Sequence, residues 1–120
     1  MVDVTVFHNP ACSTSRHALD EVSGLDLEVV QYLKSPLDKA ALLELMGKLE
    51  DPPADLVRKD SFFKGLGLDA DSYVTPEAVA DLLVEHPRLM QRPVLVRGDA
   101  AIIGRPKQRV ADFLAQTTRA

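Results

Sequence analysis

The sequence predicts an α/β fold, and three observations support that prediction. Alternating apolar and polar residues open the chain at 2–7, and apolar runs typical of strands recur at 27–32 and 93–103. Segments with apolar residues at helical spacing lie between and after these runs. The chain has 120 residues, of which 46% are hydrophobic and 27% charged, so it is long enough for one domain with a substantial core.

The first part of the chain is predicted as a strand, a helix and a second strand. Residues 2–7 form the first strand, which we expect to be buried. Either Ser13 or Cys12 caps a helix that runs to about Val22. Residues 27–32 then return as a strand and complete a strand-helix-strand unit.

A helical block follows from about residue 36 to 88. Ser35-Pro36 is typical of a helix start, with a serine cap and a proline at the first position. A shorter helix is predicted over 52–57, and Thr75-Pro76 begins another. Residues 61–63 give no signal beyond those of surface, helix end or core.

The chain ends with two strands and a helix. Residues 93–97 and 101–103 are predicted to form a hairpin around a turn at 98–100, and a helix is predicted over 107–115. The order is therefore strand-helix-strand, helical insertion, strand-strand-helix. That order is typical of a thioredoxin-like core with helices inserted between its halves, in a single domain over residues 1–120.

Composition and charge exclude several classes of protein. One cysteine cannot form an internal disulfide framework, and no signal peptide is recognised, so we expect a cytoplasmic protein. No apolar run is long enough to span a membrane. The net charge of −4 gives no overall reason to bind nucleic acid or an anionic membrane. We expect a monomer, and any anion site must come from local basic residues.

The only cysteine, Cys12, lies where the first strand passes into the first helix. Unpaired N–H groups and a positive dipole end meet there, and both stabilise a thiolate over a thiol. Hydroxyls at Thr14 and Ser15 can donate to a sulfur anion, and Arg16 adds positive charge nearby. His8 is close enough to orient the loop or to help hold the thiolate. This context favours a reactive thiol over the alternative, a small buried hydrophobic residue.

Three other motif interpretations of Cys12 fail or are weak. A cysteine-dependent phosphatase needs an arginine six positions later, where Ala18 stands. A redox CxxC motif needs a second cysteine, where Ser15 stands. His8, Cys12 and His17 do not match a standard zinc spacing, so no metal site is predicted.

A nucleophile in a loop that can bind an anion suggests an oxyanion substrate. Such a substrate is bound best by arginine, whose guanidinium group offers a fork of charged N–H donors. Arg58, Arg92 and Arg105 are candidates, although each alone is most often a solvated surface arginine. Arg92 and Arg105 directly precede prolines, which restricts their backbones. The other arginines are expected to be surface charge: Arg16, Arg88, Arg97, Arg109 and Arg119.

Pro93 stands just before the third strand of the predicted core. A thioredoxin-like fold commonly carries a cis proline there, opposite its active cysteine. The hypothesis is therefore a cis Arg92–Pro93 bond, and the alternative is an ordinary trans proline at a strand start.

With these residues the chain resembles the glutaredoxin-dependent arsenate reductase family of thioredoxin-like proteins. The resemblance extends from about residue 2 to 115. The matching stretches are HNPACSTSR around Cys12, LVRKD around Arg58, HPRLMQRPVLV around Arg92, and GRP around Arg105.

The resemblance implies an arsenate reductase that forms a cysteine-arsenate intermediate, resolved by glutathione as co-substrate and by glutaredoxin, with no bound cofactor. Its site residues would be Cys12 as the nucleophile, Arg58, Arg92 and Arg105 around the oxyanion, His8 supporting the loop, and Ser15 with a hydroxyl near the thiolate. Ser13 departs from the glycine common in the family, but it is small and keeps an N–H for the anion. The alternatives are a glutathione-dependent thiol oxidoreductase of the same fold, a redox-sensing module that contacts RNA polymerase, and a plain structural domain.

Overall fold

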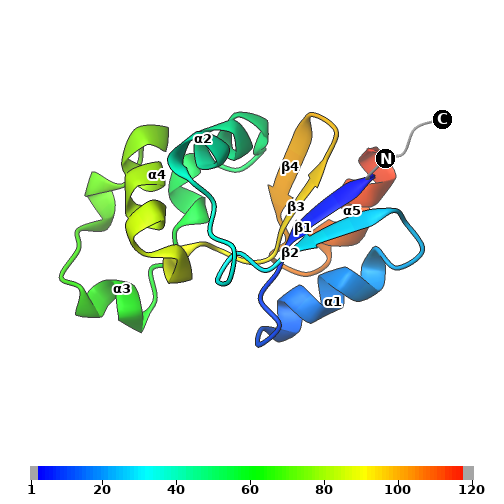
Figure 1. The fold of residues 1–120 in the computed structure, drawn as a ribbon, viewed down its shortest axis with the longest axis horizontal. Coiled ribbons are helices and arrows are strands. Elements are labelled where there is room, and N and C mark those ends of the chain that lie inside the picture. The colour runs from blue at the N-terminus through cyan, green and yellow to red at the C-terminus, as the bar shows by residue number, and fades with distance from the viewer. Residues whose placement is uncertain (1–2, 118–120) are drawn as a thin grey trace.

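A four-stranded mixed sheet organises the molecule (Figure 1). The computed structural model describes residues 3–117, so Val2 and Arg119 lie outside the described residues. The strands are β1 (Val4–Phe7), β2 (Leu27–Val30), β3 (Val94–Arg97) and β4 (Ala100–Ile103). Their order is β2-β1-β3-β4, with β1 parallel to β2 and antiparallel to β3, and with β3 antiparallel to β4. This confirms the predicted α/β class and the thioredoxin-like arrangement.

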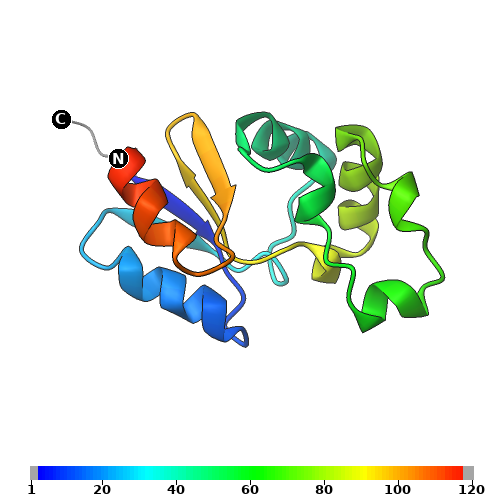
Figure 2. The same cartoon turned by 180° about the vertical axis from the view of Figure 1, so that it is seen from behind.

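Helices cover the sheet on both sides (Figures 1 and 2). They are α1 (Ser13–Glu21), α2 (Lys39–Lys48), α3 (Ser61–Gly65), α4 (Pro76–Glu85) and α5 (Arg109–Gln116), with 3₁₀ turns at Pro53–Leu56, Ala70–Ser72 and Pro87–Leu89. α1 and α5 contact each other on one face, while α2 faces the other and α3 and α4 extend the molecule outward. Within residues 3–117, no helix is both long and apolar enough to cross a membrane.

The alternation in β1 divides the core into two clusters. Val4 and Val6 are fully buried and pack in one cluster with Phe113 of α5. Phe7 points to the opposite face and packs against a second cluster that includes Leu45 of α2. One strand with period-two patterning therefore joins the sheet to helices on both sides.

The helix predicted to begin at Pro36 begins instead at Lys39. Its N-cap is Asp38, whose carboxylate accepts a hydrogen bond from the N–H of Ala41 at 2.8 Å. Ser35 belongs to the turn that leaves β2. The prediction was wrong because two capping residues, a serine and an aspartate, stand three positions apart and local preference does not choose between them.

The short helix α3 was not predicted. Asp60 caps it by accepting from the N–H of Phe63 at 3.1 Å, and the Phe63 ring is buried edge-on against Tyr73 with 6.1 Å between centroids. Five residues give barely one turn of periodicity, so this helix depends on its cap and on tertiary packing.

Two arginines predicted as surface charge connect distant parts of the chain. Arg97, with a side chain 13% exposed, binds both carboxylate oxygens of Asp3, at 2.8 and 3.1 Å. Arg109 Nη1 donates to the carboxylate of Asp51 at 2.8 Å and to the carbonyl of Ile103 at 2.9 Å. Their acidic partners lie 94 and 58 residues away in sequence, so no local pattern could reveal them.

Candidate active site

Cys12 is the N-cap of α1, and the loop before it is folded by its own polar groups. The carbonyl of Cys12 accepts the first helical hydrogen bond, from the N–H of Arg16 at 3.0 Å. Asn9 shapes the loop, because its side-chain oxygen accepts from the N–H of Ala11 at 2.9 Å and its carbonyl accepts from the N–H of Cys12 at 3.0 Å. The sulfur is thereby placed beside the unpaired N–H groups of the first helical turn.

The surroundings of Cys12 favour the thiolate. Burial alone raises the pKa of the Cys12 thiol, because a buried thiolate loses hydration. Hydrogen bonds from the backbone N–H of Ser15 and from the Arg92 side chain, the charge of Arg105 and the backbone N–H of Thr14 lower it. The lowering contributions prevail, so the pKa of Cys12 lies below the ordinary value of a thiol.

His8 and Ser15 form a buried pair beneath the loop. His8 Nδ1 lies 2.6 Å from Ser15 Oγ, and the same hydroxyl accepts from the N–H of Asn9 at 3.1 Å. Burial and the charge of Arg16 lower the pKa of His8, which favours the neutral imidazole. The Ser15 hydroxyl, expected near the sulfur, is thus bonded to His8 and the loop. The sulfur receives the backbone N–H of Ser15 instead.

Arg92 and Arg105 reach the sulfur from neighbouring loops. The register pairs Val94 with Ile103, so the loop before β3 and the loop after β4 lie side by side. Arg105 Nη2 lies 3.2 Å from Cys12 Sγ, and Arg105 Nε donates to the carbonyl of Arg92 at 2.7 Å. Two of the three predicted arginines therefore converge on the cysteine.

The peptide bonds that follow Arg92 and Arg105 are both cis. The bond to Pro93 confirms the hypothesis made from its position before the third strand, whereas the bond to Pro106 was not predicted. Gly104 packs directly on this region, because a Cβ at Gly104 would lie 2.9 Å from Pro93 Cγ. The absence of a side chain there lets the two arginine-bearing loops approach closely.

The Arg92 side chain has a buried N–H group that finds no hydrogen-bond acceptor among the described residues. Its Nε has no hydrogen-bond partner among residues 3–117. Tyr32 is buried close to it, with a hydroxyl that donates to the carbonyl of Met90 at 3.4 Å. Burial raises the pKa of Tyr32 although the charge of Arg92 opposes the rise, so the phenol stays neutral. Arg92, whose side chain also hydrogen-bonds the sulfur, therefore keeps an unpaired N–H that can serve as a donor for an anion.

The backbone of Arg58 lies beside the segment that leads to Arg92, but its side chain is directed elsewhere. Its N–H donates to the carbonyl of Leu89 at 2.7 Å, and the N–H of Gln91 donates to the carbonyl of Leu56 at 2.7 Å. The Arg58 segment thus runs beside the segment that leads to Arg92. Its guanidinium points to Asp60, with 3.8 Å between nitrogen and oxygen, and no contact with the sulfur is seen among the described side chains.

Sequence reasoning missed two residues that shape the site, Asn9 and Tyr32, and gave Arg16 only a charge near the thiolate. Arg16 is exposed, as expected, and its guanidinium also donates to the carbonyl of Pro10 at 2.8 Å, which closes the loop. Asn9 carried a usable signal, because asparagine before a proline commonly initiates a turn. Tyr32 gave no local sequence signal, because its hydrogen-bond partner Met90 lies 58 residues away in sequence.

The described residues offer no cluster of side chains typical of a metal site. No group of three His, Cys, Asp or Glu side chains among residues 3–117 could hold an ion. His17, weighed as a possible ligand, lies 3.4 Å from the carboxylate of Glu21 one turn along α1.

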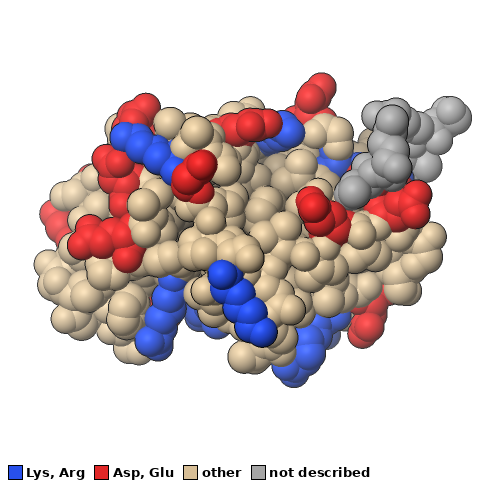
Figure 3. All heavy atoms as spheres, in the orientation of Figure 1, with Lys and Arg blue, Asp and Glu red and all other residues tan. Residues whose placement is uncertain are grey.

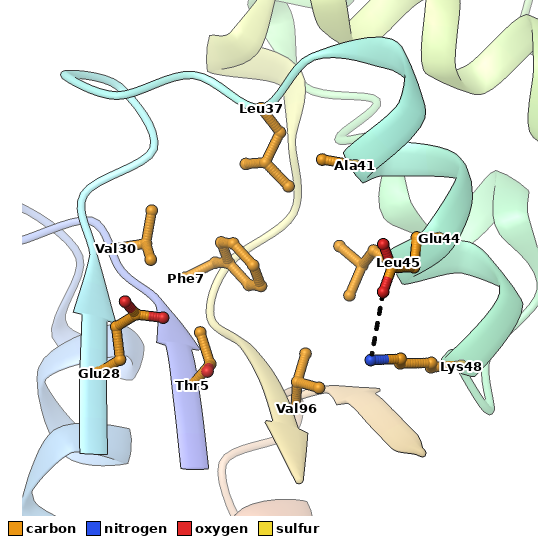
Figure 4. A pocket seen from close by; sticks show the side chains of 10 residues that line it. All are labelled: Thr5, Phe7, Glu28, Val30, Leu37, Ala41, Glu44, Leu45, Lys48 and Val96. Atoms are coloured by element: carbon orange, nitrogen blue, oxygen red, sulfur yellow. Dashed lines mark ion pairs between the residues drawn. The ribbon is translucent and has the colours of Figure 1, made fainter. Parts of the chain in front are cut away.

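A cavity of about 330 Å³ lies between the sheet and α2 (Figure 4). Phe7 and Val30 from the strands face Leu45 across it, and an ion pair between Glu44 and Lys48 lies at its α2 side, with 3.7 Å between the charged atoms. None of the predicted site residues lines this cavity.

Charge is distributed unevenly over the surface. In Figure 3, basic side chains gather along the lower edge, where the N-terminal end of α1 lies in Figure 1. The acidic side chains lie mostly along the upper and left edges and on the right of the view, several of them beside a basic one. A chain with a net charge of −4 thus presents local positive charge on the side of Cys12.

The fold and the site define a thioredoxin-like protein with an activated cysteine that faces forked cationic donors. The ArsC family profile matches residues 7–113, and the chain belongs to this family. It is 40% identical to the uncharacterized protein YfgD of Escherichia coli K12, over 92% of this chain and 96% of the relative. It is 37% identical to an arsenate reductase of Neisseria meningitidis serogroup A, over 95% and 100%. The solved structure of an arsenate reductase from Vibrio cholerae, 31% identical, matches 93% of this chain and 98% of its own with a TM-score of 0.80.

Proposed function

We propose that this protein reduces arsenate to arsenite through a cysteine-arsenate intermediate on Cys12, with glutathione and glutaredoxin as reductants. The observation that carries the proposal is the convergence of two guanidinium groups on one activated sulfur. Arg105 lies 3.2 Å from Sγ, and Arg92 adds a hydrogen bond to the sulfur and a buried, unpaired Nε. Relatives named arsenate reductases, similar along nearly the whole chain, support the choice of oxyanion.

The first step is nucleophilic attack by Cys12. Its thiolate forms a bond to arsenic, one arsenic–oxygen bond breaks, and hydroxide leaves and takes a proton from solvent to become water. Arg92 and Arg105 hold the remaining oxygens with parallel N–H donors, so charge is neutralised without proton transfer from the protein. His8 and Ser15 are positioning residues, because they hold the loop and not the sulfur.

Arg58 is the third cation of the proposal. Its backbone is fixed one segment away from Arg92, while its guanidinium faces Asp60 at 3.8 Å, near the outer limit of an ion pair. A contact of that length is weak. A rotation of the Arg58 side chain away from Asp60 brings its charge to the arsenate once the anion is bound.

The second step needs thiols from outside the chain. Reduction of arsenic(V) to arsenic(III) takes two electrons, and Cys12 is the only cysteine. Each turnover therefore converts one arsenate and two external thiols into one arsenite, one disulfide and one water. We assign these thiols to glutathione and glutaredoxin in a reducing cytoplasm, with no bound cofactor.

Arsenate-dependent oxidation of NADPH, coupled through glutathione, glutaredoxin and glutathione reductase, tests the proposal. Wild type should turn over, and Cys12→Ser should not. Arg92→Lys keeps the positive charge but loses the paired N–H donors of the guanidinium group, so the KM of this variant for arsenate should rise. Arg88→Lys is the matched control, because Arg88 stacks on the Phe62 ring at 4.4 Å in the helical insertion. Absence of arsenate-dependent turnover in wild type would refute the proposal.

A further inference from the structure

A polar cavity of about 340 Å³ lies beside Arg105. Its walls come from residues 51–59 of the helical insertion, from Gln91 before β3, and from the segment 103–109 after β4. Sites for small molecules commonly enclose roughly 300–1,000 Å³, so this cavity is large enough for a short peptide.

The charges on its walls are only partly paired with each other. Arg109 and Asp51 form an ion pair of 2.8 Å, which neutralises both. The Lys59 ammonium donates to backbone carbonyls and meets no carboxylate among the described residues. Asp55 forms no ion pair or side-chain hydrogen bond within the same residues. One cation, Lys59, and one anion, Asp55, therefore have no charged partner within the same residues and remain to meet a ligand, while Arg105 is engaged by the sulfur.

Arg105 connects this cavity to the reactive sulfur. One nitrogen of its guanidinium lies 3.2 Å from Cys12 Sγ, while the same side chain lines the cavity. The arsenic is still attached to Cys12 when the first external thiol attacks, so the thiol and the oxyanion need separate places. A molecule in this cavity would therefore meet the same side chain that contacts the sulfur, whereas the cavity of Figure 4 has no arginine in its lining.

We propose that this cavity is the binding site for the thiol co-substrate and that it recognises the α-amino acid end of glutathione. The ammonium of the γ-glutamyl group pairs with Asp55, its carboxylate pairs with Lys59, and the thiol lies toward Arg105. The arrangement is chemically complementary, because one ligand end carries both charges and the segment 55–59 offers a partner for each. This inference rests on the proposed function in taking glutathione as the reductant.

The kinetic test compares Lys59→Met with wild type. The apparent KM for glutathione should rise about three- to fivefold, the effect of losing one partly exposed ion pair. The KM for arsenate, and the rate with 2-mercaptoethanol, which has neither carboxylate nor ammonium, should stay unchanged. Asp55→Asn should act in the same direction. Lys107→Met is the matched control, because Lys107 is an exposed cation two residues after Arg105 that does not line the cavity.

A binding test keeps this inference separate from the proposed function. S-Methylglutathione, which cannot react, is titrated into the protein while backbone amide shifts are followed by NMR. Wild type and Lys107→Met should show saturable shifts within residues 51–59 and 103–109, and Lys59→Met should show weaker binding. No saturable shift in wild type, or equal binding by Lys59→Met, would overturn the inference even if arsenate is turned over. Binding as expected without arsenate turnover would instead refute the proposed function.

Discussion

Replacing Arg105 by Met removes a charge that directly contacts the sulfur of Cys12. The two atoms are 3.2 Å apart, and opposite unit charges at that separation attract by about 1.3 kcal/mol even with the dielectric constant of water. A free energy of about 1.4 kcal/mol is a factor of ten. The thiolate fraction below the pKa of Cys12 should therefore fall about tenfold in Arg105→Met. Partial burial of the site strengthens this attraction relative to its value in water.

The rate of alkylation by iodoacetamide, followed between about pH 5 and 9, measures the thiolate directly. The rate for Arg105→Met should be about tenfold lower than that of wild type at the acidic end. The two rates should converge at high pH, where the cysteine is ionised in both proteins. Lys107→Met serves as the control for loss of a nearby charge without contact. Superimposable profiles for wild type and Arg105→Met would show that the thiolate does not depend on this guanidinium.

Three further changes test the construction of the site. Ser15→Ala leaves His8 Nδ1 and the N–H of Asn9 unpaired in a buried place, so chemical denaturation should show that the free energy of unfolding falls by about 1–3 kcal/mol. An unchanged denaturation midpoint would contradict the importance of the His8–Ser15 pair. Gly104→Ala would place a Cβ 2.9 Å from Pro93 Cγ, so the free energy of unfolding should fall by about 1–3 kcal/mol. An unchanged Tm would show that the loops of Arg92 and Arg105 can move apart without loss of stability. The pKa of Cys12 is lower in the folded state than in the unfolded chain, so the unfolded state binds more protons between the two values. The unfolding free energy of wild type minus that of Cys12→Ser should therefore rise with pH across that interval and level off above the ordinary thiol pKa, whereas a flat difference from urea titrations would argue against a stabilised thiolate.

Local patterns in the chain were sufficient to predict the order of the strands and the place of Cys12 between the first strand and the first helix. β1 alternates strictly, and Thr75 and Pro76 give a cap and a first helical position, so these elements follow from short-range preferences. The place of Cys12 could be recognised because it lies between a predicted strand and a predicted helix. The first turn of a helix presents unpaired N–H groups in any fold. α3 and the start of α2 could not be predicted, because their local signals were short or duplicated.

Tertiary structure alone determined which side chains meet the sulfur. Arg105 and Cys12 are 93 residues apart and meet because β3 pairs with both β1 and β4, in registers that place Phe7 and Ile103 opposite Val94. Arg58 was a candidate beside Arg92 and Arg105, yet its guanidinium faces Asp60. Hydrogen bonds and ion pairs are short-ranged and directional, so their partners follow from the packed backbone and not from residue type. The helix-start position of the Cys12 thiol therefore follows from a few consecutive residues, while its cationic surroundings depend on the folded sheet.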